Sequence, residues 1–213
     1  MIKRIDSGSI SHLEYLAGSP GWYWGTDWTS GDLYEAEELY RDGHPVRHNR
    51  LILVHYPDGK TVEPVSAKDG QYFGRPVWSG GAAVILLADF PAGEIRVLRY
   101  DVTSGSLTGI VCLATSEVED CYNLILHTSP LCLTRQAGDR FQVIWPDRAD
   151  FPILPSESFC FRDGDLLYFS RWFEDPEYRE ETVVRRMPDG AVTDQFRGSL
   201  IDMPGGEWWL LGD

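Results

Sequence analysis

The chain has 213 residues, of which 43% are hydrophobic, and 33 acidic against 19 basic residues give it a formal charge of −14. This composition allows a sizeable hydrophobic core in one large or two small domains. The acidic excess argues against nucleic acid and anionic membrane surfaces as partners, because both are bound through basic surfaces.

The first residues are polar and show no signal peptide. No apolar run approaches the ~20 residues that a membrane-spanning helix needs. The four cysteines, Cys112, Cys121, Cys132 and Cys160, have no CxxC spacing and lie in or beside apolar runs. We therefore predict reduced, buried thiols, with a Cys112–Cys121 bridge as the alternative. Together these features predict a cytoplasmic protein, unless an export signal has been removed.

Five segments along the chain share the pattern of a β-hairpin, in which an apolar strand, a tight turn and a second short strand follow one another. The first residues of the five turns are Ser7, Asp58, Ser104, Asp147 and Asp189. They are separated by 51, 46, 43 and 42 residues, which is the length of a propeller blade. The fourth turn has Arg148 where the others have glycine, so it must be of another type.

A second pattern lies between these hairpins and consists of an aromatic or apolar strand, a short turn and another apolar strand. The two patterns together predict repeated four-stranded meanders. Ala82–Ala88 is apolar without alternation, as expected for a strand covered on both faces. Tyr40–Asn49 and Glu174–Glu181 are predicted to be inserted loops, and Glu35–Tyr40 a helical turn.

The chain begins with only the second hairpin of a unit and ends with only the first. We therefore predict one all-β domain, a small five-bladed β-propeller in which the N- and C-terminal strands share one blade. Such closure removes exposed strand edges and holds both termini. The alternative is a β-sandwich or barrel. The predicted blades are 21–66, 71–115, 121–154 and 157–197, with a closing blade of 199–213 plus 1–16 and a short loop at Met203-Pro204-Gly205-Gly206.

This repeat resembles the architecture of five-bladed propellers such as the tachylectin-type lectins and the catalytic domains of some arabinosidases. The resemblance lies in blade length, blade number and strand order. No residue motif of either group can be placed on this chain, so the resemblance implies a fold and no site residue.

A polar residue ends the innermost strand of each predicted blade. In a closed propeller these five residues ring one end of the central channel. There they either bind a polar ligand through charge-assisted hydrogen bonds or close the axis by pairing with one another. The residues are Asp27, Arg75, His127, Arg162 and Asp202.

Aromatic residues are abundant. Trp22 and Trp24 lie two apart on one predicted strand, so they share a face and are expected to pack between blades. Trp28 and Trp78 occupy corresponding turns of successive units and are predicted to be exposed. Exposed flat rings stack on sugars or fill protein hot spots.

These features predict a non-enzymatic binding or protein-interaction module whose ligand is a protein or a carbohydrate. The alternative is a glycoside hydrolase, which needs two carboxylates roughly 5–9.5 Å apart. Aspartates in turns usually accept backbone hydrogen bonds instead. We assign no catalytic residue, metal ligand or cofactor. In particular, no phosphate-binding glycine motif occurs. The candidate carboxylates for the alternative are Asp27, Asp32, Asp163, Asp165 and Asp202.

Overall fold

The computed structural model describes residues 2–28, 30–203 and 207–212. Antiparallel strands make up about half of this part of the chain, which also holds one α-helix and one short 3-10 helix. The all-β prediction is therefore confirmed. The chain divides into two compact units, Met1–Leu126 and His127–Asp213, and each is described by itself.

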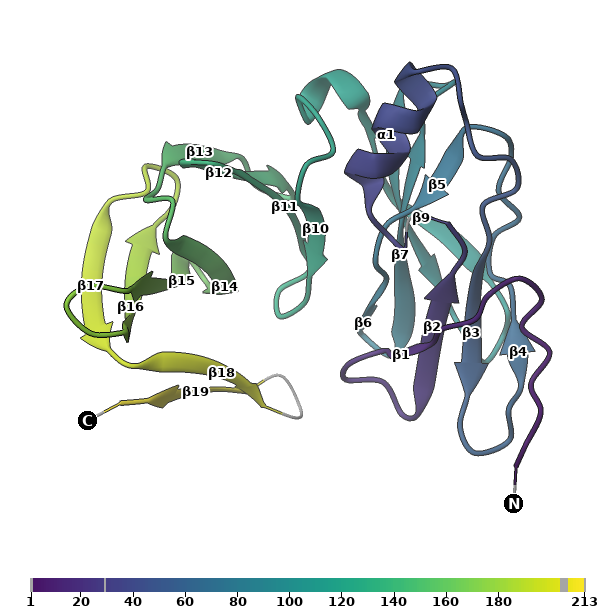
Figure 1. Cartoon of the computed structure of the whole chain (residues 1–213), viewed down its shortest axis with the longest axis horizontal. Coiled ribbons are helices and arrows are strands. Elements are labelled where there is room, and N and C mark those ends of the chain that lie inside the picture. Colours follow the sequence, from purple (N-terminus) through teal and green to yellow (C-terminus); the bar gives the residue numbers. More distant parts are fainter. Residues whose placement is uncertain (1, 29, 204–206, 213) are drawn as a thin grey trace. The chain divides into compact units, whose positions relative to one another are not determined.

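The first unit opens with a four-stranded antiparallel meander in the order β1-β2-β3-β4 (Figure 1). Its strands are β1 (Glu14–Tyr15), β2 (Trp22–Thr26), β3 (Leu51–His55) and β4 (Thr61–Val62).

The helix α1 (Leu33–Arg41) lies between β2 and β3 in the sequence, where we predicted only a helical turn. Asp32 caps its first turn, because the Asp32 carboxylate accepts hydrogen bonds from the backbone N–H groups of Tyr34 (2.9 Å) and Glu35 (3.2 Å). Leu33, Ala36 and Glu37 are its buried residues, at the three- and four-residue spacing of one helix face. Capping and one apolar face together extend the turn into a helix.

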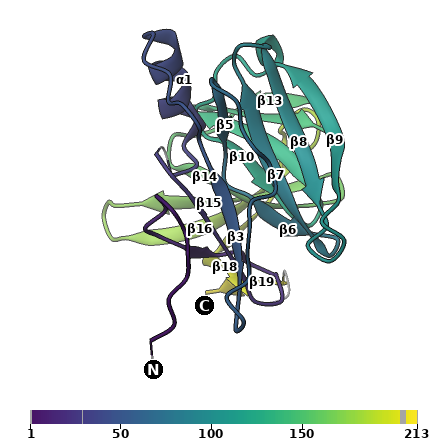
Figure 2. The same ribbon diagram turned by 90° about the vertical axis from the view of Figure 1, so that its right-hand side faces the viewer.

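The second sheet of the first unit has the order β5-β7-β8-β9, and β6 pairs with β7. All eight residues of β7 are buried, which confirms the prediction of a strand covered on both faces. The short 3-10 helix Thr115–Glu117 follows this sheet. In Figure 2 β7, β8 and β9 lie side by side. The strands are β5 (Gln71–Phe73), β6 (Val77–Ser79), β7 (Ala82–Asp89), β8 (Glu94–Tyr100) and β9 (Leu107–Ala114).

The core of the first unit lies between these two sheets. Trp22 and Trp24 of β2 are each 5% exposed and pack with Phe73 and with Ile85 of β7. The prediction that Trp22 and Trp24 are buried between two sheets is therefore confirmed.

The N-terminal segment covers the other face of the first sheet. Ile5 packs against a cluster that Ile10 forms with Ile52 of β3, and the Lys3 amine donates a 2.8 Å hydrogen bond to the carbonyl oxygen of Pro57. Residues 2–13 belong to no strand. The apolar side chains of this segment are used to cover β3, so the predicted terminal hairpin around Ser7 is not formed.

The second unit contains two further four-stranded antiparallel meanders, in the orders β10-β11-β12-β13 and β14-β15-β16-β17. The junction between the units falls within β10 (Leu124–His127). Phe141, Phe151 and Phe169 form the centre of the second core. The remaining strands are β11 (Cys132–Ala137), β12 (Arg140–Trp145), β13 (Ala149–Pro152), β14 (Glu157–Asp163), β15 (Leu166–Phe173), β16 (Arg179–Arg186) and β17 (Val192–Arg197).

A two-stranded sheet ends the described chain, formed by β18 (Ser199–Met203) and β19 (Glu207–Leu211). Residues 204–206 of the loop predicted to close this hairpin lie outside the described residues. We predicted that the two termini share one blade and that the chain has five blades; both stay predictions.

Four of the five predicted hairpins are confirmed, with Asp58, Ser104, Asp147 and Asp189 in the turns between paired strands. Other local predictions are wrong. Arg179–Glu181 was expected in a loop but begins β16, where these residues pair with β15. Cys112 is exposed on β9 and Cys160 is only half-buried, so burial is confirmed for Cys121 and Cys132; all four cysteines are free as predicted.

Candidate functional site

A cleft of about 620 Å³ in the first unit brings together two of the residues that the sequence singled out, Trp28 and Arg75. Its lining includes Trp28, Ser30, Asp32, Glu35, Arg75 and Cys121. The indole of Trp28 is 67% exposed. We call this the first-unit cleft.

The backbone that carries Trp28 is strained. Trp28 has a φ of 61° and Ser30 one of 49°, in the left-handed region that bulky residues rarely adopt. Asn123, which also lines the cleft, has a φ of 47°. Such conformations cost of order 1–3 kcal/mol each and cluster at ligand-binding sites. The strain therefore marks this wall of the cleft as a candidate site.

Arg75 supplies a cation to the same cleft. It follows β5 and is exposed, and within the described part of the chain its guanidinium makes no hydrogen bond or ion pair. Gly31 makes room for it, because a Cβ atom at Gly31 would lie 2.9 Å from the Arg75 Cγ atom. The φ of Gly31, 82°, also requires glycine. A guanidinium with no partner among the described residues thus lines the same cleft as an exposed indole.

Two further groups in the cleft have other roles. Asp32 caps α1 through its Oδ1 atom. Cys121 is buried, and burial raises the pKa of its thiol. A thiol held in the protonated form is a poor nucleophile.

Asp27 lies next to Trp28 but is occupied by structural contacts. Its Oδ1 atom accepts hydrogen bonds from the Asn49 side chain (3.0 Å) and from the Arg50 backbone N–H (2.8 Å), and its Oδ2 atom accepts one from Ser9 (3.0 Å). Asn49 is 1% exposed. The predicted ligand residue Asp27 therefore fixes the end of β2.

Trp78 lies on β6 and is half-buried, where it packs against the core of the first unit. It does not line the first-unit cleft. The prediction of an exposed turn residue is therefore wrong for Trp78, whereas Trp28 is exposed as predicted.

His127 ends β10. Burial lowers the pKa of its imidazole to about 4. The ring hydrogen-bonds the Thr134 hydroxyl at 2.9 Å and stands edge-on to Phe159, with ring centroids 4.8 Å apart. His127 is therefore a neutral packing residue at pH 7.

Arg162 and Asp202 complete the predicted set. The Arg162 guanidinium forms a 2.6 Å ion pair with Asp147 and donates to the Gly164 carbonyl oxygen. Asp202 is exposed on β18, opposite Trp208 of β19. All five ring residues lie within two residues of the end of a strand, and their arrangement around one channel stays a prediction.

The carboxylates of the hydrolase alternative do not gather in the described clefts. Asp32 alone among the five lines the first-unit cleft. Within the described ranges no group of three or more His, Cys, Asp or Glu side chains has a metal-binding arrangement. The α-helix there is too short and too polar to cross a membrane.

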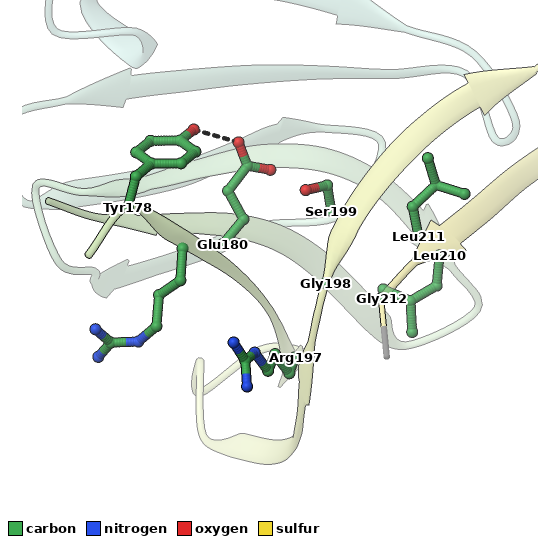
Figure 3. A pocket seen from close by; sticks show the side chains of 9 residues that line it. Tyr178, Glu180, Arg197, Gly198, Ser199, Leu210, Leu211 and Gly212 are labelled. Atoms are coloured by element: carbon green, nitrogen blue, oxygen red, sulfur yellow. Dashed lines mark hydrogen bonds between the residues drawn. The ribbon is translucent and has the colours of Figure 1, made fainter.

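The second unit has a cleft of its own, of about 380 Å³, between the end of β17 and the end of β19. Figure 3 shows Tyr178 and Ser199 turned toward Glu180, with Arg197 clear of them. The hydroxyl groups of Ser199 and Tyr178 donate to Glu180 and lower the pKa of its carboxyl. We call this the second-unit cleft.

Sequence reasoning missed the second-unit cleft because its residues come from β16, β17, β18 and β19 or from positions next to these strands, and only the fold brings them together. Gly198 permits this meeting, because its φ is 130° and a Cβ atom there would lie 2.4 Å from the Leu211 carbonyl oxygen. The available signal was a glycine between a charged strand and an apolar one, in the run Arg197-Gly198-Ser199-Leu200.

Comparison with known proteins finds no matching family model and no matching curated protein. Similar solved structures include a chain of a mitotic checkpoint complex, with a TM-score of 0.42 and 14% identity over 71% of this chain and 46% of that one. Another is a bifunctional GH43-CE protein of Bacteroides eggerthii, with a TM-score of 0.41 and 10% identity over 97% and 31%. A third comes from a study of two prolyl endopeptidases, with a TM-score of 0.39 and 13% identity over 89% and 29%.

In each of these three matches the aligned region spans less than half of the other chain. The scores and identities are too low to assign this chain to a fold family or to transfer a function.

Proposed function

We propose that this protein is a non-enzymatic binding module and that its first-unit cleft holds a carbohydrate. The observation that carries the proposal is the presence in one cleft of the exposed Trp28 indole and of the Arg75 guanidinium, which has no partner among the residues that the structure describes. A flat aromatic face stacks on the apolar face of a sugar ring. A guanidinium donates several directed hydrogen bonds to the hydroxyl or carboxylate oxygens around that ring.

The size and preorganisation of the cleft support the same ligand class. Its volume of about 620 Å³ lies within the range of small-molecule sites, roughly 300–1,000 Å³. The left-handed backbone at Trp28 and Ser30 restricts the directions in which the indole leaves the chain, which reduces the entropy lost on binding.

The cleft favours binding over glycoside hydrolysis. Hydrolysis requires one carboxyl group to donate a proton while a second acts as base or nucleophile. Asp32, the candidate carboxylate in the cleft, already accepts two backbone hydrogen bonds as the cap of α1. Moving it to a catalytic position would uncap the helix.

A glycan array probed with the full chain and with Trp28→Ala and Arg75→Gln tests this proposal. We expect each substitution to weaken binding by about tenfold or more, since a buried aromatic contact contributes about 1.5–3 kcal/mol. Trp172→Ala is the matched control, because Trp172 lies in the second unit and is 44% exposed. Thermal unfolding should be unchanged in Trp28→Ala, whose side chain is mostly in solvent.

Retention of glycan binding in both cleft variants, or absence of any bound glycan, would overturn the proposal. Mass spectrometry of the bound glycans after incubation separates the two functions, because a hydrolase shortens them and a binding module leaves them intact.

A further inference from the structure

The hairpin β18–β19 leaves apolar side chains uncovered in the second unit. Ile201 and Trp209 are cross-strand partners, as are Ser199 and Leu211, so these four residues share one face of the hairpin. On this face Ile201 is 37%, Trp209 52% and Leu211 54% exposed. The opposite face is partly covered, because the Trp208 indole stacks on Phe161 with ring centroids 4.9 Å apart.

The backbone of β19 also lacks a partner on one side. In the described chain β18 and β19 pair only with each other. An isolated two-stranded sheet is marginally stable in water, and its free edge presents unpaired N–H and C=O groups to any extended segment. Addition of a strand at such an edge is a recurring mode of peptide recognition.

A cationic group lines the cleft at the C-terminal end of β19. The Arg197 guanidinium has no hydrogen bond or ion pair to any described residue and lines the second-unit cleft together with Leu210 and Leu211. Figure 3 shows the Leu210 and Leu211 side chains leaving β19 in opposite directions, so one end of the strand offers apolar contacts on both sides. Glu180, the carboxylate in the cleft, is already engaged by Tyr178 and Ser199.

We propose that the β19 edge is a docking site for an extended peptide of another protein that carries apolar side chains and an acidic side chain. The peptide adds as a third strand to β18–β19. Its apolar side chains cover Ile201 and Trp209, and its carboxylate pairs with Arg197. At short range the Arg197 cation favours a carboxylate of the partner at this place.

The N-terminal segment of the same chain fits this edge less well. It carries Lys3 and Arg4, whose charge has the same sign as that of Arg197. Its Lys3 amine and Ile5 side chain are already engaged by the first unit. Pairing of residues 2–6 with β19 is therefore the competing outcome of the test.

The test is selection of a displayed library of random heptapeptides on the full chain. We expect enrichment of peptides in which β-branched or aromatic residues alternate and one residue is Asp or Glu. Enriched peptides, made synthetically, should bind Arg197→Gln about tenfold or more weakly, as expected for loss of a charge-assisted hydrogen bond. Binding to Trp209→Thr should also be weaker, while bound peptide should protect the β19 amides from hydrogen exchange.

Arg186→Gln is the matched control, because the Arg186 side chain is 54% exposed in the same unit and pairs with Asp189 away from the cleft. Trp28→Ala must also leave peptide binding unchanged, which keeps this site separate from the first-unit cleft. Far-UV circular dichroism of each variant checks that it is folded.

Three outcomes would overturn the proposal. They are the absence of enriched peptides, equal binding of enriched peptides to wild type and Arg197→Gln, and enrichment that appears only after residues 2–6 are deleted. The last outcome would show that the N-terminal segment occupies the β19 edge.

Discussion

The buried carboxylate of Glu157 should stabilise the second unit strongly. Glu157 is 0% exposed, and its two carboxylate oxygens accept hydrogen bonds from the Arg185 guanidinium at 3.0 and 3.1 Å. The Arg185 side chain is itself only 12% exposed. The substitution Glu157→Gln keeps the shape of the side chain but removes its charge, so it leaves the Arg185 cation buried without a counter-ion.

The expected loss follows from these contacts. A hydrogen bond to a charged group contributes about 1.5–3 kcal/mol, and breaking a buried ion pair by removing one partner costs about 3–5 kcal/mol. We therefore expect Glu157→Gln to lower the free energy of unfolding by about 3–5 kcal/mol. Asp150→Asn is the control, because the Arg140–Asp150 pair has side chains that are 49% and 44% exposed and should contribute less than about 1 kcal/mol.

Urea denaturation followed by far-UV circular dichroism measures both losses. The double variant Glu157→Gln/Arg185→Gln should lose less than the two single variants added together, since the two residues act as one unit. A loss in Glu157→Gln no larger than that in Asp150→Asn would refute the reasoning, because burial would then not distinguish the two ion pairs.

Two further predictions concern stability. Burial lowers the pKa of His127 to about 4, whereas an unfolded histidine titrates near pH 6.5. As the pH falls, the unfolded state therefore takes up the proton first. The free energy of unfolding should be highest above pH 6.5 and fall by up to about 3 kcal/mol as the pH drops toward 4. Denaturation midpoints from pH 7 to 4.5 should show this fall in wild type and a smaller one in His127→Gln, and parallel curves would contradict it. Asp32→Ala should destabilise the first unit by about 1 kcal/mol through loss of the α1 cap, and Asp32→Asn, which retains a capping oxygen, should not; equal losses in thermal unfolding would show that capping is not the cause.

The sequence by itself determined the strands and most of their turns. The alternation of apolar residues and the turn pairs beginning at Asp58, Ser104 and Asp189 are local features, and strand pairing across a short turn is decided by neighbours in the chain. The unbroken apolar run Ala82–Ala88 likewise indicated a strand covered on both faces. A strand with one face in solvent alternates apolar and polar residues, whereas a strand buried on both faces does not.

Local patterns misjudged the N-terminal hairpin. Ile5 and Ile10 read as strand residues, but their side chains gain more by covering Ile52 of β3 than by forming a ladder with no neighbouring strand. The same limit applies to β16, which begins at Arg179 because β15 offers it a partner along eight residues.

Tertiary structure alone decided which candidate residues can meet a ligand. Asp27 and Trp28 are adjacent in sequence. The Asp27 carboxylate accepts hydrogen bonds from Asn49 and Arg50, whereas Trp28 is exposed and lines the same cleft as Arg75. Arg197 and Leu211 lie fourteen residues apart and meet only because Gly198 lets their strands approach. Strand formation depends on nearest neighbours in the chain, whereas the exposure and pairing of a polar side chain depend on groups that only folding brings near.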